Sequence, residues 1–360
     1  MLPANEAFMR SEAIGFINVT RQCNVDCKRC YLTEEHRSTK ERLSVAILQQ
    51  FLRSSFWVDR ECTLIWEGGE PSVIGPQAMQ LLVDTARRQL PSAKQTMVTN
   101  CFSVPDWLLA MVHEEFDGLV ETTYALGNKF NLAGSEVIYQ ERFLSGLNKF
   151  WSAGVPCVVN VELNAETVRA GADALVDVML QSECKIWEFD ISVDFASFLR
   201  TPVYHPASTP ALPLTVPYQK AWSYLADLKE RHYARLNRAG ITIGVFEQNP
   251  DAGNLQFNVL SEDRFLTLNP DGTVTTNPLY SDLEGTILGD LHHSSLDSMI
   301  ISRNRLARIS HERRRMRACN ECEHVSYCGG GPAHVPVFDG SGECAGGLSI
   351  WNSLLRMQSA

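Results

Sequence analysis

Three cysteines lie within eight residues near the start of the 360-residue chain, where Cys23, Cys27 and Cys30 form a C-x3-C-x2-C pattern. Thiolates so close in sequence select soft metal centres, either zinc or an iron-sulfur cluster. A structural zinc site is normally closed by a fourth protein ligand, whereas three cysteines leave one coordination position open. The spacing therefore indicates a [4Fe-4S] cluster with one iron free to bind substrate or cofactor.

A second set of cysteines lies near the C-terminus. Cys319, Cys322 and Cys328 form a C-x2-C-x5-C pattern, and Cys344 follows after fifteen intervening residues. Four thiolates make a closed site, and zinc ribbons use similar spacings, so zinc and iron-sulfur both fit this set on its own. Together with the first set, the pattern favours an iron-sulfur cluster.

The tetrapeptide Gly68-Gly69-Glu70-Pro71 follows the first cysteine set. A C-x3-C-x2-C loop after one strand and Gly-Gly-Glu-Pro after the next resembles the radical S-adenosylmethionine (SAM) enzymes. The resemblance implies that the three cysteines hold the cluster, that its free iron chelates the amino and carboxylate groups of SAM, and that the Gly68–Pro71 backbone receives the SAM amino group. Arg29 stands where the family often has an aromatic residue. Tyr31, directly after the third cysteine, is common in one branch and is a candidate cofactor-binding residue.

The ends of later strands supply further cofactor-binding candidates by the same resemblance. Thr99-Asn100 closes the third predicted strand much as Thr-Asn-Gly does in the family, with Cys101 at the glycine position. Thr123 lies on the fourth strand, where relatives often place a residue that contacts the SAM ribose.

Polar residues alternate with apolar ones along the fifth and sixth predicted strands. Asn160 and Glu162 share one face of the fifth strand, and Glu188 and Asp190 share one face of the sixth, by the two-residue period of strands. These faces are expected to line the interior of the sheet, where they bind SAM, orient a cationic substrate or supply a general base. Asn160 and Glu162 are thus candidates for cofactor binding, and Glu162, Glu188 and Asp190 are candidates for catalysis. The alternative for each carboxylate is a structural ion pair with a nearby Lys or Arg.

Two other residues are candidates for radical chemistry. Tyr124 on the fourth strand is a candidate radical relay, although buried phenols are more often simply packed or hydrogen-bonded. Cys101 lies near the active end of a strand and is a candidate hydrogen-atom donor. Buried strand cysteines are usually inert, which is the interpretation of Cys62, Cys157 and Cys184.

The last third resembles the SPASM extension of radical SAM enzymes, through a hairpin with Asp271-Gly272, a Leu288-Gly289-Asp290-Leu291 stretch and the four late cysteines. Full SPASM domains hold two auxiliary clusters with seven cysteines. Here non-ligating residues stand where the other thiolates are expected: Leu266, Leu268, Asn277 and Pro332. The resemblance therefore implies one auxiliary [4Fe-4S] cluster, held by Cys319, Cys322, Cys328 and Cys344, and two clusters in all.

Strands alternate with helices over residues 13–194. The predicted strands are Ala13–Thr20, Cys62–Trp66, Gln95–Thr99, Gly118–Ala125, Pro156–Asn164 and Lys185–Asp194. The predicted helices, with apolar residues at helical spacing, are Ser44–Phe56, Pro76–Gln89, Pro105–Glu115, Tyr139–Ala153 and Gly171–Gln181. This alternation calls for a parallel sheet, either open and doubly wound or curved into a partial barrel. The resemblance implies an α/β fold: a partial (β/α)6 TIM-like barrel with a smaller C-terminal loop-rich α+β SPASM-like domain.

Four parts are expected along the chain: a short leader at 1–14, the radical SAM partial barrel at 15–200, a linker and bridging helix at 201–244, and the SPASM-like auxiliary-cluster domain at 245–360. Five prolines in Thr201–Pro217 indicate an irregular linker or lid, and apolar spacing predicts a helix over Tyr218–Ala239 that ends at Gly240. The turn Asn269-Pro270-Asp271-Gly272 predicts a hairpin within Leu266–Thr276.

Composition limits the classes of partner. A formal charge of -10 argues against an extended surface for nucleic acid or anionic membrane. The basic run at Arg313–Arg317 is interpreted as a solvated helix face. The sequence has neither a secretory signal pattern nor an apolar run of about 18 residues that could span a bilayer, so a reducing cytoplasm is expected.

The resemblance implies an enzyme that cleaves SAM reductively to a 5′-deoxyadenosyl radical, which abstracts hydrogen from a substrate C-H bond. Oxidation or crosslinking of a peptide or protein side chain is the favoured reaction, with an electron donor such as flavodoxin or ferredoxin. Few residues precede the first strand, so a separate peptide-presenting protein or a small biosynthetic metabolite is the alternative. A non-catalytic iron-sulfur or zinc protein is the alternative of another class.

Overall fold

The computed structural model describes residues 12–116, 119–195, 211–247, 261–281, 283–328, 330–332, 334–350 and 352. A ten-stranded sheet in the order β12-β11-β10-β1-β3-β4-β5-β7-β8-β9 forms its centre. The strands are β1 (Glu12–Thr20), β3 (Glu61–Gly68), β4 (Lys94–Val98), β5 (Val120–Tyr124), β7 (Cys157–Leu163), β8 (Ile186–Ile191), β9 (Thr242–Ile243), β10 (Phe265–Leu268), β11 (Thr273–Thr275) and β12 (Gly289–Asp290). Most of the expected leader, residues 1–11, and part of the expected linker, 201–210, lie outside the described residues.

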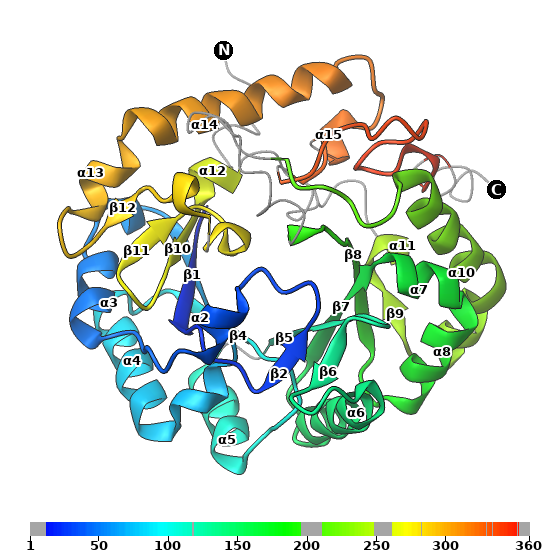
Figure 1. Ribbon diagram of the computed structural model, residues 1–360, viewed down its shortest axis with the longest axis horizontal. Coiled ribbons are helices and arrows are strands. Elements are labelled where there is room, and N and C mark those ends of the chain that lie inside the picture. Colours follow the sequence, from blue (N-terminus) through cyan, green and yellow to red (C-terminus); the bar gives the residue numbers. More distant parts are fainter. Residues whose placement is uncertain are drawn as a thin grey trace.

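The six predicted strands are confirmed as β1, β3, β4, β5, β7 and β8, and each runs parallel to its neighbour. Side chains alternate between the two faces of these strands. On β8, Trp187 and Phe189 are 0% and 5% exposed, and they alternate with the partly exposed Glu188 and Asp190. The sheet curves into a partial barrel with helices outside it, as the α/β interpretation predicted (Figure 1).

Helices α3, α4, α5, α6, α8 and α10 surround the strands in Figure 1. Their bounds are α3 (Val45–Leu52), α4 (Pro76–Gln89), α5 (Asp106–Glu115), α6 (Glu136–Ser152), α8 (Ala172–Gln181) and α10 (Tyr218–Arg238). Caps explain where these bounds differ from the prediction. Helix α6 begins three residues early because the Ser135 side chain accepts the backbone N–H of Ile138. Asn164 caps a further helix, α7 (Ala165–Ala170), in the same way through Thr167.

The predicted hairpin is present as β10 and β11, but it does not stand apart from the barrel. Strand β10 pairs in parallel with β1, from Ile14 with Phe265 to Ile17 with Leu268. β11 and β12 then extend the same sheet by antiparallel pairing. The sheet therefore crosses the boundary expected near residue 245.

The remaining C-terminal elements are α12 (Ser261–Arg264), α13 (Leu296–Ile300), α14 (Arg303–Arg315), the 3-10 helix η7 (Met316–Cys319) and α15 (Val325–Cys328). Helix α10 contacts the last described segment, because Tyr218 Oη donates to the Pro336 carbonyl (2.6 Å) and Trp222 Nε1 donates to the Cys344 carbonyl (2.8 Å). Among the helices that the structure describes, none combines the length and the hydropathy needed to cross a membrane.

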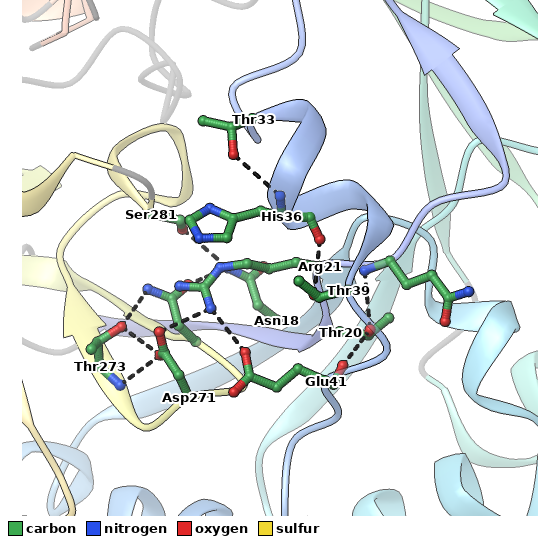
Figure 2. A network of polar contacts seen from close by, with 12 residues as sticks. Asn18, Thr20, Arg21, Thr33, His36, Thr39, Glu41, Asp271, Thr273 and Ser281 are labelled. Carbon is green, nitrogen blue, oxygen red and sulfur yellow. Dashed lines mark hydrogen bonds and ion pairs between the residues drawn. The ribbon is translucent and has the colours of Figure 1, made fainter. Parts of the chain in front are cut away.

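Two buried polar links join the end of β1 to the hairpin, and Figure 2 shows both. Asn18 Nδ2 donates to Asn269 Oδ1 (2.7 Å) and to Ser281 Oγ (3.1 Å). Arg21, which is 4% exposed, directs Nη1 at Asp271 Oδ2 (2.9 Å) and Glu41 Oε2 (3.3 Å). The start of the cysteine loop is thus bonded to a turn about 250 residues later in the chain.

Replacing Asp271 with asparagine tests the second link. The new side chain would keep an oxygen for the hydrogen bonds from Thr273 N (3.0 Å) and Oγ1 (2.7 Å), while the charge facing the buried guanidinium disappears. We expect Asp271→Asn to lower the free energy of unfolding by about 1–3 kcal/mol, less than the loss of a fully buried pair because Glu41 remains.

Denaturant titration of the anaerobic protein measures this effect. The matched control is Asp106→Asn, which removes a pair with Lys149 that is equally short (2.7 Å) but exposed, so no measurable change is expected. Equal effects for the two variants would contradict the importance of burial at Arg21.

Candidate active site

The first cysteine set lies in a loop attached to the sheet at both ends. The short strand β2 (Val25–Cys27) pairs antiparallel with β6 (Lys129–Asn131), which follows β5. Lys28 N donates to the Asn128 carbonyl and Arg29 N donates to Asn128 Oδ1, both at 2.9 Å. This pairing places the cysteine loop over the ends of the central strands (Figure 1).

The Gly-Gly-Glu-Pro segment holds the other end of the loop through its backbone. Gly69 N donates to the Thr20 carbonyl (2.8 Å) and Glu70 N donates to the Gln22 carbonyl (2.9 Å). A Cβ on Gly68 would lie 2.2 Å from the Thr20 oxygen, and one on Gly69 would lie 2.2 Å from the Gln22 oxygen. Both positions therefore require glycine because two backbones meet there.

The Glu70 side chain joins the ends of β3 and β4. It is 0% exposed and accepts hydrogen bonds from Ser72 N (3.0 Å), Thr99 Oγ1 (3.0 Å) and Asn100 N (2.8 Å). Pro71 begins the 3-10 helix η2 (Pro71–Ile74), which the Glu70 side chain caps. The structure thus brings together three of the predicted cofactor-binding residues, Glu70, Thr99 and Asn100, beside the cysteine loop.

The three thiols of the loop are close neighbours and only partly exposed. Burial raises the pKa of Cys23 and of Cys30 to about 12, and each of these thiols also feels the charge of Cys27. Thiols with such pKa values become thiolates on binding a metal centre, so loading releases protons. Within the described residues, no three His, Cys, Asp or Glu side chains gather as a site for a single metal ion. The donor set fits a soft multi-metal cluster, held on three sides by Cys23, Cys27 and Cys30.

Several predicted cofactor residues surround Cys23. Its thiol lies 3.4 Å from the Gly69 carbonyl oxygen and 3.8 Å from Asn100 Nδ2. Asn100 Nδ2 also donates to Asn24 Oδ1 (2.7 Å), and Tyr31 Oη donates to the Gly68 carbonyl (3.3 Å). The structure therefore places Tyr31, Gly68, Gly69 and Asn100 beside one edge of the loop.

Sequence reasoning did not predict the contacts of two cations near the loop, Lys129 and Arg29. Lys129, 4% exposed, donates to the Thr123 carbonyl and hydroxyl. Burial raises the pKa values of Cys27 and Glu162, and the charge of Lys129 opposes this rise in both. Arg29 bonds both carboxylate oxygens of Glu166, at 2.9 and 2.7 Å. The Arg29 position, which departs from the family pattern, thus anchors the loop to helix α7.

Polar side chains line the interior of the barrel as predicted. Strand register places Thr123 beside Asn160 and Asn160 beside Glu188, while Glu162 pairs with Asp190. Glu162 Oε2 accepts a hydrogen bond from Asn128 Nδ2 (2.9 Å). Burial raises the pKa of both Glu188 and Asp190 to about 7.

Two further interior carboxyls, Glu67 and Glu121, were not predicted. Glu67 directly precedes Gly68 on β3, and burial together with the charge of Glu121 raises its pKa to about 8. Burial also raises the pKa of Glu121 on β5. The alternation of Glu121 and Thr123 with the buried Val120 and Thr122 was the available signal.

The two candidates for radical chemistry lie outside this interior group. The Tyr124 ring, 2% exposed, stacks on Phe143 of α6 at 5.1 Å between centroids, in the layer between sheet and helix. Cys101 is 0% exposed and adopts a positive φ of 55°, and Gly146 packs against its carbonyl oxygen. The backbone at Cys101 thus has the conformation that the glycine of the family pattern would adopt. Tyr124 is a packed side chain, which was expected from the sequence as the alternative to a radical relay.

The four late cysteines also lie near one another. Burial raises the pKa of Cys319, and the charges of Cys344 and Cys322 raise it further; burial and the charges of Cys344 and Cys319 do the same for Cys328. Arg315 donates to the carbonyls of Pro332 (3.0 Å) and Val335 (2.6 Å), which fastens the segment after Cys328 to α14. The interpretation of this basic run as a solvated helix face holds for the exposed Arg313, Arg314 and Arg317 and is wrong for Arg315.

Solved structures share this architecture. Native anSMEcpe with bound AdoMet superposes with a TM-score of 0.72 and 14% identity, covering 95% of this chain and 96% of that one. Native anSMEcpe with bound AdoMet and Cp18Cys peptide gives the same score and identity over 95% of each chain. SuiB of Streptococcus suis bound to precursor peptide SuiA gives 0.54 at 13% identity, over 94% of this chain and 78% of that one. No protein-family model and no curated protein matches the sequence.

These likenesses confirm the fold that the motifs predicted. It is the fold of the radical SAM enzymes with a SPASM-like extension, and the cysteine loop lies at the strand ends as that class requires. At such low identity the comparison establishes architecture, while the roles of individual side chains rest on the contacts above.

Substitution of Gly69 tests whether the backbone contact with Gly-Gly-Glu-Pro positions the thiols. We expect Gly69→Ala to displace residues 21–22, because its Cβ would lie 2.2 Å from the Gln22 oxygen and 2.4 Å from the Arg21 oxygen. Iron bound by the first cysteine set should fall accordingly, measured as iron and sulfide per chain after anaerobic reconstitution.

Gly75→Ala is the matched control for that experiment. Gly75 has a positive φ of 83°, but no atom lies within 4 Å of the place that a Cβ would occupy. At this φ and a ψ of 164° alanine costs on the order of 1–3 kcal/mol of backbone strain, but it meets no atom of the cysteine loop, so the variant should keep full iron content. Equal iron loss in both variants, or none in either, would contradict the positioning role.

The raised pKa of Glu67 predicts a dependence of stability on pH. The folded state holds this proton up to a pH of about 8, whereas the unfolded chain releases it near 4.5, so the free energy of unfolding falls as pH rises through that window. We expect Glu67→Gln to be more stable than wild type at pH 8 by on the order of 1–3 kcal/mol and nearly unchanged at pH 5.

Denaturant titrations at both pH values check this expectation. Glu188 and Asp190 have pKa shifts of the same sign, so a reduced slope remains in the variant. The control Glu230→Gln removes an exposed carboxylate of α10 and should leave the slope unchanged. A stability difference for Glu67→Gln that is equal at both pH values would contradict the assignment.

Proposed function

We propose that the chain is a radical SAM enzyme that modifies a peptide or protein side chain by abstracting hydrogen from a C-H bond. The observation that carries the proposal is the attachment of a three-thiol loop to the Gly-Gly-Glu-Pro backbone, directly over a polar barrel interior. The fold supports it, and neighbours crystallised with AdoMet and a peptide support the substrate class.

Cys23, Cys27 and Cys30 would hold a [4Fe-4S] cluster, and Gly68–Pro71, Tyr31, Thr99, Asn100, Thr123, Asn160 and Glu162 would face SAM. Bound together, cluster and SAM supply one-electron reductive cleavage to a 5′-deoxyadenosyl radical. The side chains of the protein would orient SAM and the substrate and enclose them. Glu70 fixes the strand ends below the loop, and Lys129 places a buried positive charge beside Cys27 and Glu162.

An auxiliary cluster on Cys319, Cys322, Cys328 and Cys344 would accept an electron from the substrate, which makes net oxidation the proposed outcome. Glu162, Glu188 and Asp190 are the proposed acid–base groups, since their raised pKa values suit proton transfer near neutral pH. Electrons for SAM cleavage would come from a flavodoxin or ferredoxin.

Anaerobic reconstitution, reduction and addition of SAM test the function. Wild type is expected to contain about eight irons per chain and to form 5′-deoxyadenosine. Cys27→Ser should abolish 5′-deoxyadenosine, and Cys328→Ser should retain its formation with about four irons. Cys62→Ser, a buried cysteine outside both sets, is the matched control and should keep both clusters.

Three results would revise the proposal. Formation of no 5′-deoxyadenosine by fully loaded wild type would support a non-catalytic iron-sulfur protein. Zinc at the late cysteines would remove the auxiliary cluster. Deuterium transfer to 5′-deoxyadenosine from a labelled metabolite, and not from labelled peptides, would identify a small biosynthetic substrate.

A further inference from the structure

Four carboxyl groups project from the interior face of three strands and act on one another. Glu67 lies on β3, Glu121 on β5, and Glu188 and Asp190 on β8. Glu121 is central to the group, because its charge adds to the effect of burial in raising the pKa of each of the other three. Glu121, Glu188 and Asp190 are partly exposed, so solvent and solutes reach the group.

These four carboxyl groups have no partner among the described residues, neither a hydrogen-bond donor to the side chain nor an ion pair. Other interior acids differ: Glu70 accepts from Thr99 and Asn100, and Glu162 accepts from Asn128. Glu70 and Glu162 thus have hydrogen-bond donors from the chain, whereas the group of four carboxyls has neither a donor nor a cation among the described residues. Such a cluster of like charges is unfavourable unless a ligand compensates it.

Asn160 provides an independent sign of a ligand. Its side chain is 8% exposed, and its Oδ1 has no donor within hydrogen-bond distance in the described part of the chain. Strand register places Asn160 between Thr123 and Glu188, on the same interior face as the carboxyls. Glu67 Oε1, in a side chain that is also 8% exposed, likewise has no donor. Buried acceptors of this kind are normally satisfied, so donors from outside the chain are expected here.

The chemistry of the group selects an organic cation. Asn160 Oδ1 is an acceptor at any pH, and each carboxyl becomes acceptor-only when it loses its proton. A ligand that offers several donors and a positive charge therefore binds the group best in its ionised form. A metal ion is disfavoured, because no three carboxylate, histidine or cysteine side chains of the described residues gather closely enough to hold one. An ammonium group offers three N–H donors and a guanidinium offers five, spread over a larger volume.

We propose that Glu67, Glu121, Glu188 and Asp190 bind the cationic side chain of the substrate, a lysine ammonium or an arginine guanidinium. Asn160, which lies between Thr123 and Glu188 and so borders the proposed SAM site, would accept a hydrogen bond from the same cation. This inference rests on the proposed function and adds a substrate class to it: a peptide with a basic residue in or beside the modified position. The Glu188 carboxylate packs against Gly244, where a Cβ would lie 1.7 Å from Glu188 Oε1, so this position requires glycine.

Binding of small probes to the reconstituted full-length protein, with SAM at saturation, tests the proposal by isothermal titration calorimetry. Nα-acetyl-lysine methylamide is expected to bind at least about tenfold more tightly than its uncharged analogue Nα-acetyl-norleucine methylamide. The arginine and citrulline derivatives form a second pair, which distinguishes guanidinium from ammonium.

Variants show whether the carboxyl group is responsible. Glu121→Gln and Glu188→Gln are expected to weaken the cationic probe about tenfold each. Both remove like-charge repulsion, so they should fold, which circular dichroism and iron content verify. Glu230→Gln on the exposed face of α10 is the matched control and should bind like wild type.

Three results would overturn the inference: equal binding of charged and uncharged probes, unchanged binding in both interior variants, or, in a parallel titration without SAM, binding of the lysine probe that is lost when SAM is at saturation, which would assign the carboxyls to the cofactor. Formation of 5′-deoxyadenosine by wild type, measured on the same preparation, distinguishes failure of this inference from failure of the proposed function. If wild type cleaves SAM but does not bind the lysine probe, this inference is refuted and the proposed function is not.

Discussion

The close approach of two backbone segments, at the ends of β1 and β3, determines the rest of the site. Gly68 and Gly69 lie so near residues 20–22 that no side chain fits between them, and two N–H groups of this segment bond the cysteine loop directly. Glu70 then links that contact to the end of β4 through its carboxylate. These contacts are made by backbone atoms, which have no alternative rotamers. They therefore allow little displacement of the thiols relative to the sheet.

The sequence predicted what local patterns encode. The alternation of strand-like and helix-like segments located all six barrel strands, and cysteine spacing with Gly-Gly-Glu-Pro located the loop. Missing features were those made by distant pairs: β2 with β6, Arg29 with Glu166, and β10 with β1. Tyr124 shows the limit within a strand, because alternation gives two faces but does not say which one turns toward the helices.

Charge is distributed unevenly across the interior. On the side of the cysteine loop, Lys129 and Arg29 accompany Glu162 and Glu166, so positive and negative groups balance. Beside them on the interior face, Glu67, Glu121, Glu188 and Asp190 accumulate without a counter-charge among the described residues. A buried group that stays partly protonated lowers the stability of the empty protein and favours whatever cation neutralises it. The cost in stability and the selectivity for a ligand are thus two results of one arrangement.

The parallel pairing of β1 with β10 has a consequence for synthesis on the ribosome. One edge of β1 stays unpaired until about 250 further residues have been made, which takes roughly 12–50 s at the usual rate of translation. An exposed strand edge is a template for misassembly during that time. Closure of this edge also brings Asp271 to Arg21, two residues before Cys23. The cysteine loop therefore gains its last neighbours only late in synthesis.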